Sequence, residues 1–209
     1  RIYNGAMDNA AGVATLLDIA QMLRETTAKT RRSLLFVAVT GEEKVGHAGS
    51  GYFTAHPTVP STSMVANLNV DMFLPLYPLR LVTVYGLNES DLGDTVRRVA
   101  ELLDVEVQDD PAPQRNVFIR SDQYNFIRCG IPAIMAGFGN KKESREEGIE
   151  RAWLRNRYHA PSDDLNQPID LQAAADYNRF LLRLVEAVAN DDGRPQWKTT
   201  SFFRRFSSA

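Results

Sequence analysis

Runs of consecutive apolar residues predict buried strands at four places in the chain, because a strand covered on both faces lacks polar alternation. These runs cover residues 34–39, 64–70, 81–85 and 131–138. The first is bounded most sharply, since two arginines precede it and Thr40 and Gly41 follow it. Strands separated by helical segments indicate an α/β domain.

Apolar residues at helical spacing predict amphipathic helices between these strands. The expected helices cover residues 9–24, 91–103, 124–128 and 170–189, with a short one before residue 57. The first should pack on the sheet through Val13, Leu16, Leu17, Ala20 and Leu23, and the last through Leu171, Ala174, Tyr177, Leu181, Leu184 and Val188. Residues 105–113 and 140–156 lack periodicity and are expected to be loops, and residues 191–209 form a tail.

Composition restricts the function only by exclusion. The 209 residues suffice for one α/β domain with a sizeable core. A net charge of -2 gives no electrostatic reason to expect nucleic acid or a membrane surface as partner. No stretch approaches the roughly 20 apolar residues of a membrane span, and the single Cys129 excludes an internal disulfide.

Acidic residues follow two of the predicted strands. Glu42 and Glu43 come just after residues 34–39, and Asp71 ends the run 64–70. Sites in open α/β sheets form beyond the carboxyl ends of the strands, so these acids are expected at one edge. Of two neighbouring acids there, one could anchor a cation while the other moves protons.

Asp8 and His159 complete a candidate constellation, one at a helix start and one in a loop. Carboxylates with one imidazole suit zinc or a similar divalent ion. Each residue also has an ordinary interpretation: Asp8 as a helix cap, Asp71 as a turn former and His159 as a loop residue. It is less expected that all of these ordinary roles occur together at the same edge than that the residues form a single site.

The chain resembles the M28-type family of zinc-dependent aminopeptidases over essentially its whole length to about residue 189. The resemblance rests on five motifs in order: Gly5-Ala-Met-Asp-Asn-Ala-Ala-Gly-Val13, Gly41-Glu-Glu43, Asn69-Val-Asp71, Arg120-Ser-Asp122 and Tyr158-His-Ala-Pro-Ser-Asp163. It implies a three-layer α/β/α fold of the phosphorylase/hydrolase type with a mostly parallel central sheet. Residues 1–190 would be the catalytic domain, an expected extracytoplasmic peptidase acting on peptide substrates.

The resemblance also implies a role for each motif residue. Asp8 would bridge two zinc ions, with Glu43 and His159 binding one of them and Asp71 the other. Glu42 would be the general base, and Tyr158 would donate a hydrogen bond to the developing oxyanion. Arg120 would contact substrate, and Asp163 would orient His159.

Two departures from the family pattern affect these expectations. A family His on a strand upstream of the Asp8 motif has no counterpart here, so we expect a fragment lacking N-terminal strands, with an unpaired sheet edge. It should bind at most one tightly held zinc, or none, and show little activity. His47 and His56 do not match that ligand by motif, and we interpret both as ordinary histidines. Gln123 stands where many relatives have His, and we expect this difference to have only a local effect.

Three other functions are compatible with the sequence. A glutaminyl-cyclase-like acyltransferase would use one zinc, a receptor-like domain would lack catalysis, and a carboxypeptidase would need a basic pocket for acidic C-terminal residues. The intact pair Asp8-Asn9 favours the peptidase over the cyclase. Ser121 has no adjacent His to activate it, which argues against a serine hydrolase.

Overall fold

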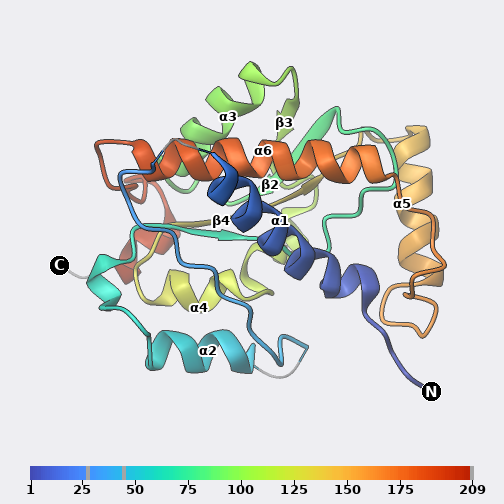
Figure 1. The fold of residues 1–209 in the computed structure, drawn as a ribbon, viewed down its shortest axis with the longest axis horizontal. Helices are drawn as coiled ribbons and strands as arrows, with labels where there is room; N and C mark the ends of the chain where they lie inside the picture. Colours follow the sequence, from blue (N-terminus) through green and yellow to red (C-terminus); the bar gives the residue numbers. More distant parts are fainter. Residues whose placement is uncertain (27–28, 44–45, 208–209) are drawn as a thin grey trace.

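Within the residues that the computed structural model describes, 1–26, 29–43 and 46–207, a four-stranded mixed sheet lies at the centre (Figure 1). In spatial order its strands are β1 (Asn67–Asn69), β4 (Ala133–Phe138), β2 (Leu81–Tyr85) and β3 (Glu106–Gln108). β1 is parallel to β4 and β2 to β3, whereas β2 and β4 are antiparallel. The α/β class is confirmed, with one antiparallel pair within the sheet.

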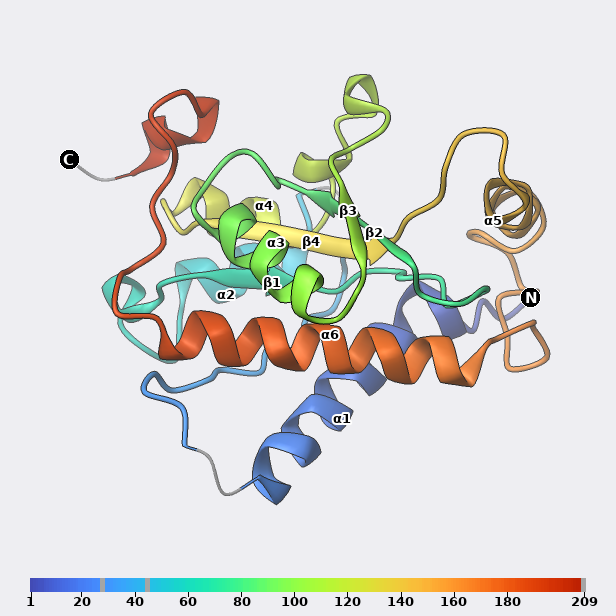
Figure 2. The ribbon, with the colours of Figure 1, turned by 90° about the horizontal axis from the view of Figure 1, so that it is seen from above.

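Helices cover both faces of this sheet. They are α1 (Ala11–Glu25), α2 (Ala48–Ala55), α3 (Leu92–Leu102), α4 (Gln123–Arg128), α5 (Arg145–Asn156) and α6 (Leu171–Asn190). Short helical turns cover Ala6–Ala10, Ser61–Ser63, Pro113–Arg115, Val117–Ile119 and Phe202–Phe206. Figure 2 shows α6 and α1 on one side of β4 and α4 on the other, and Figure 1 shows α2 next to α4, which gives the three expected layers. Among the described residues, no helix is long and apolar enough to cross a membrane.

The main core lies between the sheet and helices α3 and α6. Val82 of β2, Ile134 of β4, Val96 of α3 and Tyr177 of α6 belong to one cluster of buried side chains. The Tyr177 hydroxyl donates a hydrogen bond to the carbonyl oxygen of Ala136, which ties α6 to β4. This half of the domain is closely packed, so burial of its apolar surface supplies most of the stabilisation.

The two long helices bury their predicted apolar faces to different extents. In α6 the expected inward residues from Tyr177 to Val188 are buried, and only Leu171, in the first turn, is 77% exposed. In α1, Ile19 is buried but Val13 and Leu17 are 44% and 68% exposed. The face of α1 that the sequence assigned to the sheet is therefore only partly covered.

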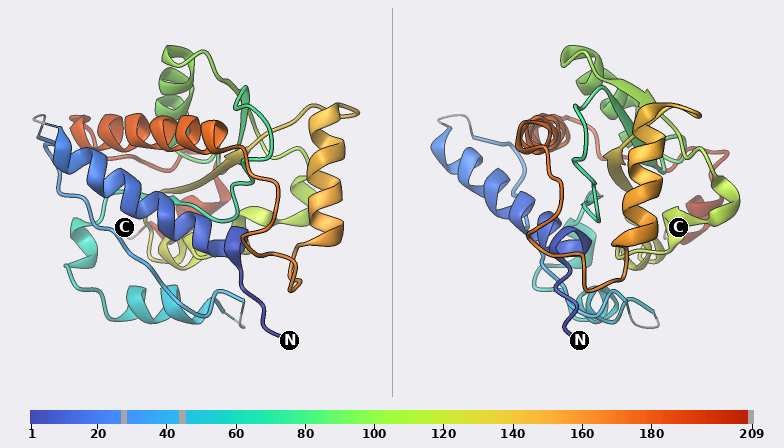
Figure 3. Two further views of the ribbon diagram at one scale, coloured as in Figure 1. Left: turned by 45° about the vertical axis from the view of Figure 1, so that its right-hand side comes forward. Right: turned by 90° about the vertical axis from the view of Figure 1, so that its right-hand side faces the viewer.

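Residues 34–39 do not form the buried strand that the sequence predicts. The segment from residue 29 to residue 43 runs from the end of α1 toward α2 as irregular chain (Figure 3). Leu35 and Phe36 are 48% and 41% exposed. A strand requires a neighbour that accepts and donates its backbone hydrogen bonds, and within the described residues this segment pairs with none.

A cavity of about 1180 Å³ separates this segment from β1. Its walls are residues 32–43, residues 63–71, the inner side of α1 and the C-terminal half of α6. Among the described strands β1 pairs only with β4, so its other edge borders the cavity. We call this space the sheet-edge groove; Asp8, Glu42, Glu43 and Asp71 line it.

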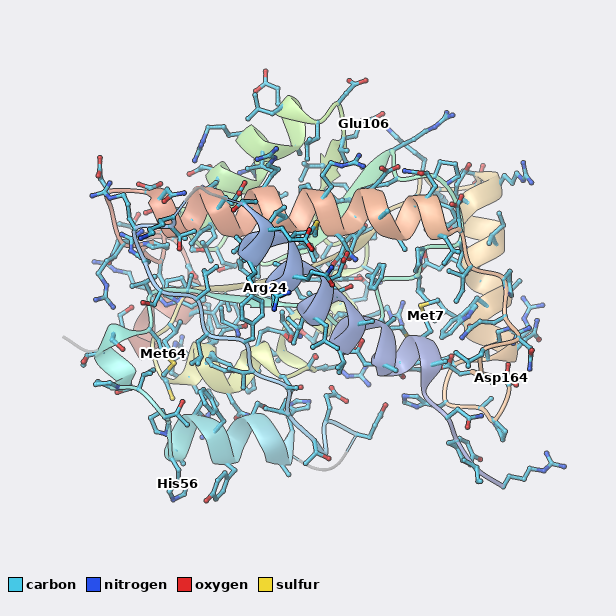
Figure 4. All side chains as sticks on the ribbon, in the orientation of Figure 1. Met7, Arg24, His56, Met64, Glu106 and Asp164 are labelled. Atoms are coloured by element: carbon cyan, nitrogen blue, oxygen red, sulfur yellow. The ribbon has the colours of Figure 1, made fainter. Side chains whose placement is uncertain are left out.

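The two expected loops contain regular structure. Residues 106–108 form the edge strand β3, where Gln108 donates a hydrogen bond to Thr83. Residues 145–156 form α5, which Ser144 caps by accepting a hydrogen bond from the backbone N–H of Glu147. Trp153 is the single buried residue of α5, and the charged residues around it in the sequence leave no apolar periodicity. That side chain packs with Met7, which lies beside α5 (Figure 4).

The C-terminal tail packs against the domain. Trp197 is 6% exposed, and its indole N–H donates a hydrogen bond to the carbonyl oxygen of Gly130. It shares a second apolar cluster with Phe118 and Phe203, and it forms a backbone bridge with Ser90. Trp197 and Phe203 of the tail thus pack near Ala133, at the start of β4.

Candidate metal centre and catalytic site

Asp8, Glu43 and His159 converge at one end of the sheet-edge groove. The Nε2 atom of His159 lies 3.2 Å from Oδ2 of Asp8 and 3.0 Å from Oε1 of Glu43. One ligand atom from each residue lies within 4.8 Å of the others. Two carboxylate oxygens and one imidazole nitrogen form a donor set that zinc accepts, with a fourth position left open. The residues therefore fit a divalent zinc ion.

Asp8 is held in place by the loop that carries His159. The carboxylate of Asp163 accepts hydrogen bonds from the backbone N–H groups of Met7, at 2.8 Å, and Asp8, at 3.0 Å. Gln167 donates a third at 2.8 Å, and Asp163 is only 2% exposed. The resemblance implied that Asp163 orients His159, but these contacts show it supporting Asp8.

Tyr158 and His159 stand together at the mouth of the site. Their rings stack with centroids 3.8 Å apart, and the side chain of His159 is 48% exposed. His159 adopts a left-handed backbone conformation with φ of 51°, which turns the chain at this point. Partial burial and the negative charges of Asp8 and Glu43 raise the pKa of Tyr158, so its hydroxyl stays a hydrogen-bond donor.

Asp71 is fixed by a polar network beneath the groove. The Ser121 hydroxyl donates a hydrogen bond of 2.7 Å to Oδ2 of Asp71. Asn69 donates to Ser121 and to Gln123, and Gln123 donates to the carbonyl oxygen of Phe118. Burial raises the pKa of Asp71 above its ordinary value, and the Ser121 hydrogen bond opposes that rise.

Glu42 lies beside a histidine that the sequence did not connect with the site. The Nε2 atom of His47 is 3.7 Å from Oε1 of Glu42. His56, by contrast, stacks on Tyr52 at the end of α2. Arg120 is exposed at the end of the turn Val117–Ile119, immediately before Ser121.

The acids in the groove repel one another when all are charged. Burial, then Asp71 and Glu43, raises the pKa of Asp8 to about 7. Burial and the same two neighbours raise the pKa of Glu42 to about 8. A divalent cation bound among these carboxylates would remove the repulsion and restore their charged forms.

These pKa values predict the pH dependence of the metal-free chain. Asp8 and Glu42 bind protons more tightly when folded, so the free energy of unfolding should fall as pH rises from about 4 to about 8. We expect a lower melting temperature at pH 8 than at pH 5 in the presence of a chelator. Glu42→Gln should show a smaller decrease, and an equal decrease in both proteins would contradict the assignment.

The sequence contained signals for some of the supporting residues. Asn69 and Asp71 are two residues apart along an extended chain, and this period places both side chains on the same face. The partners Gln123 and Gln167 had no such signal, because long-range folding alone brings them to Asn69 and Asp163.

A family model matches most of this chain. Residues 2–185 match the family described as "Peptidase family M28". In solved structures, BSAP, a zinc aminopeptidase from Bacillus subtilis, aligns with 20% identity and a TM-score of 0.69, covering 90% of this chain and 43% of its own. An aminopeptidase from Aneurinibacillus sp. strain AM-1 aligns with 21% identity and a TM-score of 0.66, covering 91% and 41%.

A third structure broadens the set. Glutaminyl cyclase from Porphyromonas gingivalis aligns with 18% identity and a TM-score of 0.55, covering 88% of this chain and 64% of its own. None of the curated proteins matches the sequence. The chain thus spans less than half the length of the two aminopeptidases, and at these identities the likeness shows the fold.

Proposed function

The chain belongs to peptidase family M28, and on that premise we propose that it carries the zinc-binding and proton-transfer residues of an exopeptidase that removes N-terminal residues from peptides. One observation carries the proposal. Asp8, Glu43 and His159, which come from three distant segments, present their ligand atoms within 4.8 Å of one another. The structural likeness to two aminopeptidases supports the choice of reaction.

In this proposal zinc is held by Asp8, Glu43 and His159. Bound zinc lowers the pKa of a coordinated water from about 15.7 toward about 7 and polarises a carbonyl oxygen. Glu42 takes a proton from the attacking water and returns it to the leaving amine. Its pKa of about 8 in the metal-free chain would fall beside a cation, which makes it a base at neutral pH.

Tyr158 and Arg120 act on the substrate in the same scheme. The Tyr158 hydroxyl donates a hydrogen bond to the oxygen on which negative charge develops, and its raised pKa keeps that proton in place. Arg120 is exposed next to Ser121, and in this proposal it would contact the bound peptide. Asp163 keeps Asp8 at its position through two backbone hydrogen bonds.

Asp71 would belong to a second zinc ion that shares Asp8 with the first. In the described residues only the Asp8, Glu43 and His159 set meets the geometry for three ligands, so we expect one tight zinc per chain. Zinc titration of the metal-free chain, read by competition with a chelator, tests this. Finding no site contradicts the proposed function. Two tight sites contradict the one-ion expectation and point to His47, near Glu42, as a further ligand.

A glutaminyl-cyclase-like reaction is the second candidate, favoured by the fold likeness to the Porphyromonas gingivalis enzyme. The two reactions differ in product: hydrolysis frees an amino acid, whereas cyclisation of an N-terminal glutamine frees ammonia. A panel of aminoacyl anilides beside a glutaminyl peptide distinguishes them. We expect release of the aniline, and ammonia release with no aniline would reverse the choice.

A further inference from the structure

Asn9 makes hydrogen bonds on both sides of Asp71. Its side-chain amide donates to the carbonyl oxygen of Val70 at 2.9 Å. Its side-chain oxygen accepts from the backbone N–H of Met72 at 3.3 Å. The two peptide groups that flank Asp71 therefore bond to one side chain, and that side chain follows Asp8 directly in the sequence.

The same side chain also fixes the start of α1. Its oxygen accepts a second hydrogen bond, 3.0 Å long, from the backbone N–H of Gly12 in the first turn. A Cβ atom at position 12 would lie 2.4 Å from the Asn9 oxygen and 2.8 Å from the Val70 carbonyl oxygen. Only glycine allows the helix to approach the end of β1 this closely.

From these contacts we propose that Asn9 is a positioning residue that sets the separation of the Asp8 and Asp71 carboxylates across the metal centre. Asp8 reaches the site from the helix layer and Asp71 from the sheet. Asn9 is the side chain that joins the backbones next to both. The inference rests on the proposed zinc-binding function and adds to it a residue that touches neither ion nor substrate.

The position of Asn9 explains why an amide is required there. A carboxylate could accept from Met72 and Gly12 but could not donate to Val70, and a hydroxyl is too short to span all three groups. An unmade hydrogen bond at a partly buried backbone group is destabilising. Residues that orient metal ligands typically change metal affinity by about 10–100-fold when they are replaced.

Zinc affinity and hydrogen exchange together test this role. In Asn9→Ala we expect zinc to bind about 10–100-fold more weakly than in the wild type. Gly12→Ala keeps the amide but forces the helix away from β1, so it should weaken zinc binding as well. Asn178→Ala is the matched control, because Asn178 joins α1 to α6 through Thr15 and Asp18, remote from the metal ligands.

The control separates positioning from general stability. Asn178→Ala should lower the melting temperature and leave the zinc dissociation constant unchanged. Unchanged zinc affinity in Asn9→Ala, with the wild type binding zinc, overturns the positioning role. In the metal-free chain, the Met72 amide should exchange faster in Asn9→Ala than in the wild type, and equal exchange overturns the contact. A wild type without zinc contradicts the proposed function and leaves this exchange measurement decisive for the contact.

Discussion

Glu42→Gln is expected to lower peptide hydrolysis by about 10²–10⁴-fold while zinc binding stays at the wild-type level. Glutamine has nearly the shape of glutamate but cannot accept the proton of the attacking water. The zinc ligands Asp8, Glu43 and His159 are untouched by the change. Initial rates of hydrolysis of an aminoacyl anilide measure the activity, and zinc content is measured on the same samples. Both measurements use the shortest form of the polypeptide that shows activity.

Glu101→Gln provides the matched control for this variant. Glu101 is exposed on α3, and the same substitution there should leave both rate and zinc content unchanged. If Glu42→Gln kept near-normal turnover with full zinc, Glu42 would not be the base. A loss of zinc along with activity would instead make Glu42 a ligand, a role that its contact with His47 also allows.

His159→Ala is expected to weaken zinc binding by at least about 100-fold, because it removes the only nitrogen from the three-ligand set. Asp163→Ala should weaken it by about 10–100-fold, through the loss of two hydrogen bonds that hold the backbone at Met7 and Asp8. Competition with a chromogenic chelator measures both affinities, and circular dichroism checks that each variant is folded.

His56→Ala is the control for the histidine variant. His56 stacks on Tyr52 at the end of α2, so its loss should not change zinc affinity. Wild-type zinc affinity in both His159→Ala and Asp163→Ala would mean that the Tyr158–Asp163 motif is structural. Equal weakening in His56→Ala would show that the measurement reports a general effect of histidine loss.

Local pattern was enough to predict the elements that bury one continuous face. Strand β2 and helices α3 and α6 lie where the periodicity places them, since Val96, Tyr177 and Leu184 all face one core. The pattern failed for residues 34–39, because apolar character predicts burial and cannot supply the neighbour that a strand needs. It failed for α5 because one buried side chain, Trp153, leaves no periodic stripe.

The site was predictable in part for a similar reason. Acids at the ends of apolar runs marked Glu42, Glu43 and Asp71, and the structure brings the first two to the same cavity as Asp71. The sequence could not show that Asp163 bonds to the backbone of Asp8, since that contact joins residues far apart in the chain. Tertiary packing, rather than the motif, decides that Asp163 supports the backbone at Asp8.

The irregular segment before Glu43 affects how firmly Glu43 is held relative to Asp8 and His159. Residues 33–40 make no backbone hydrogen bond within the described chain, whereas the backbone N–H of Asp8 donates a hydrogen bond to Asp163. Such a segment opens locally at little free-energy cost while the core stays folded. A metal ion shared by Glu43, Asp8 and His159 would act as a cross-link. Part of its binding free energy would therefore offset the cost of ordering that segment.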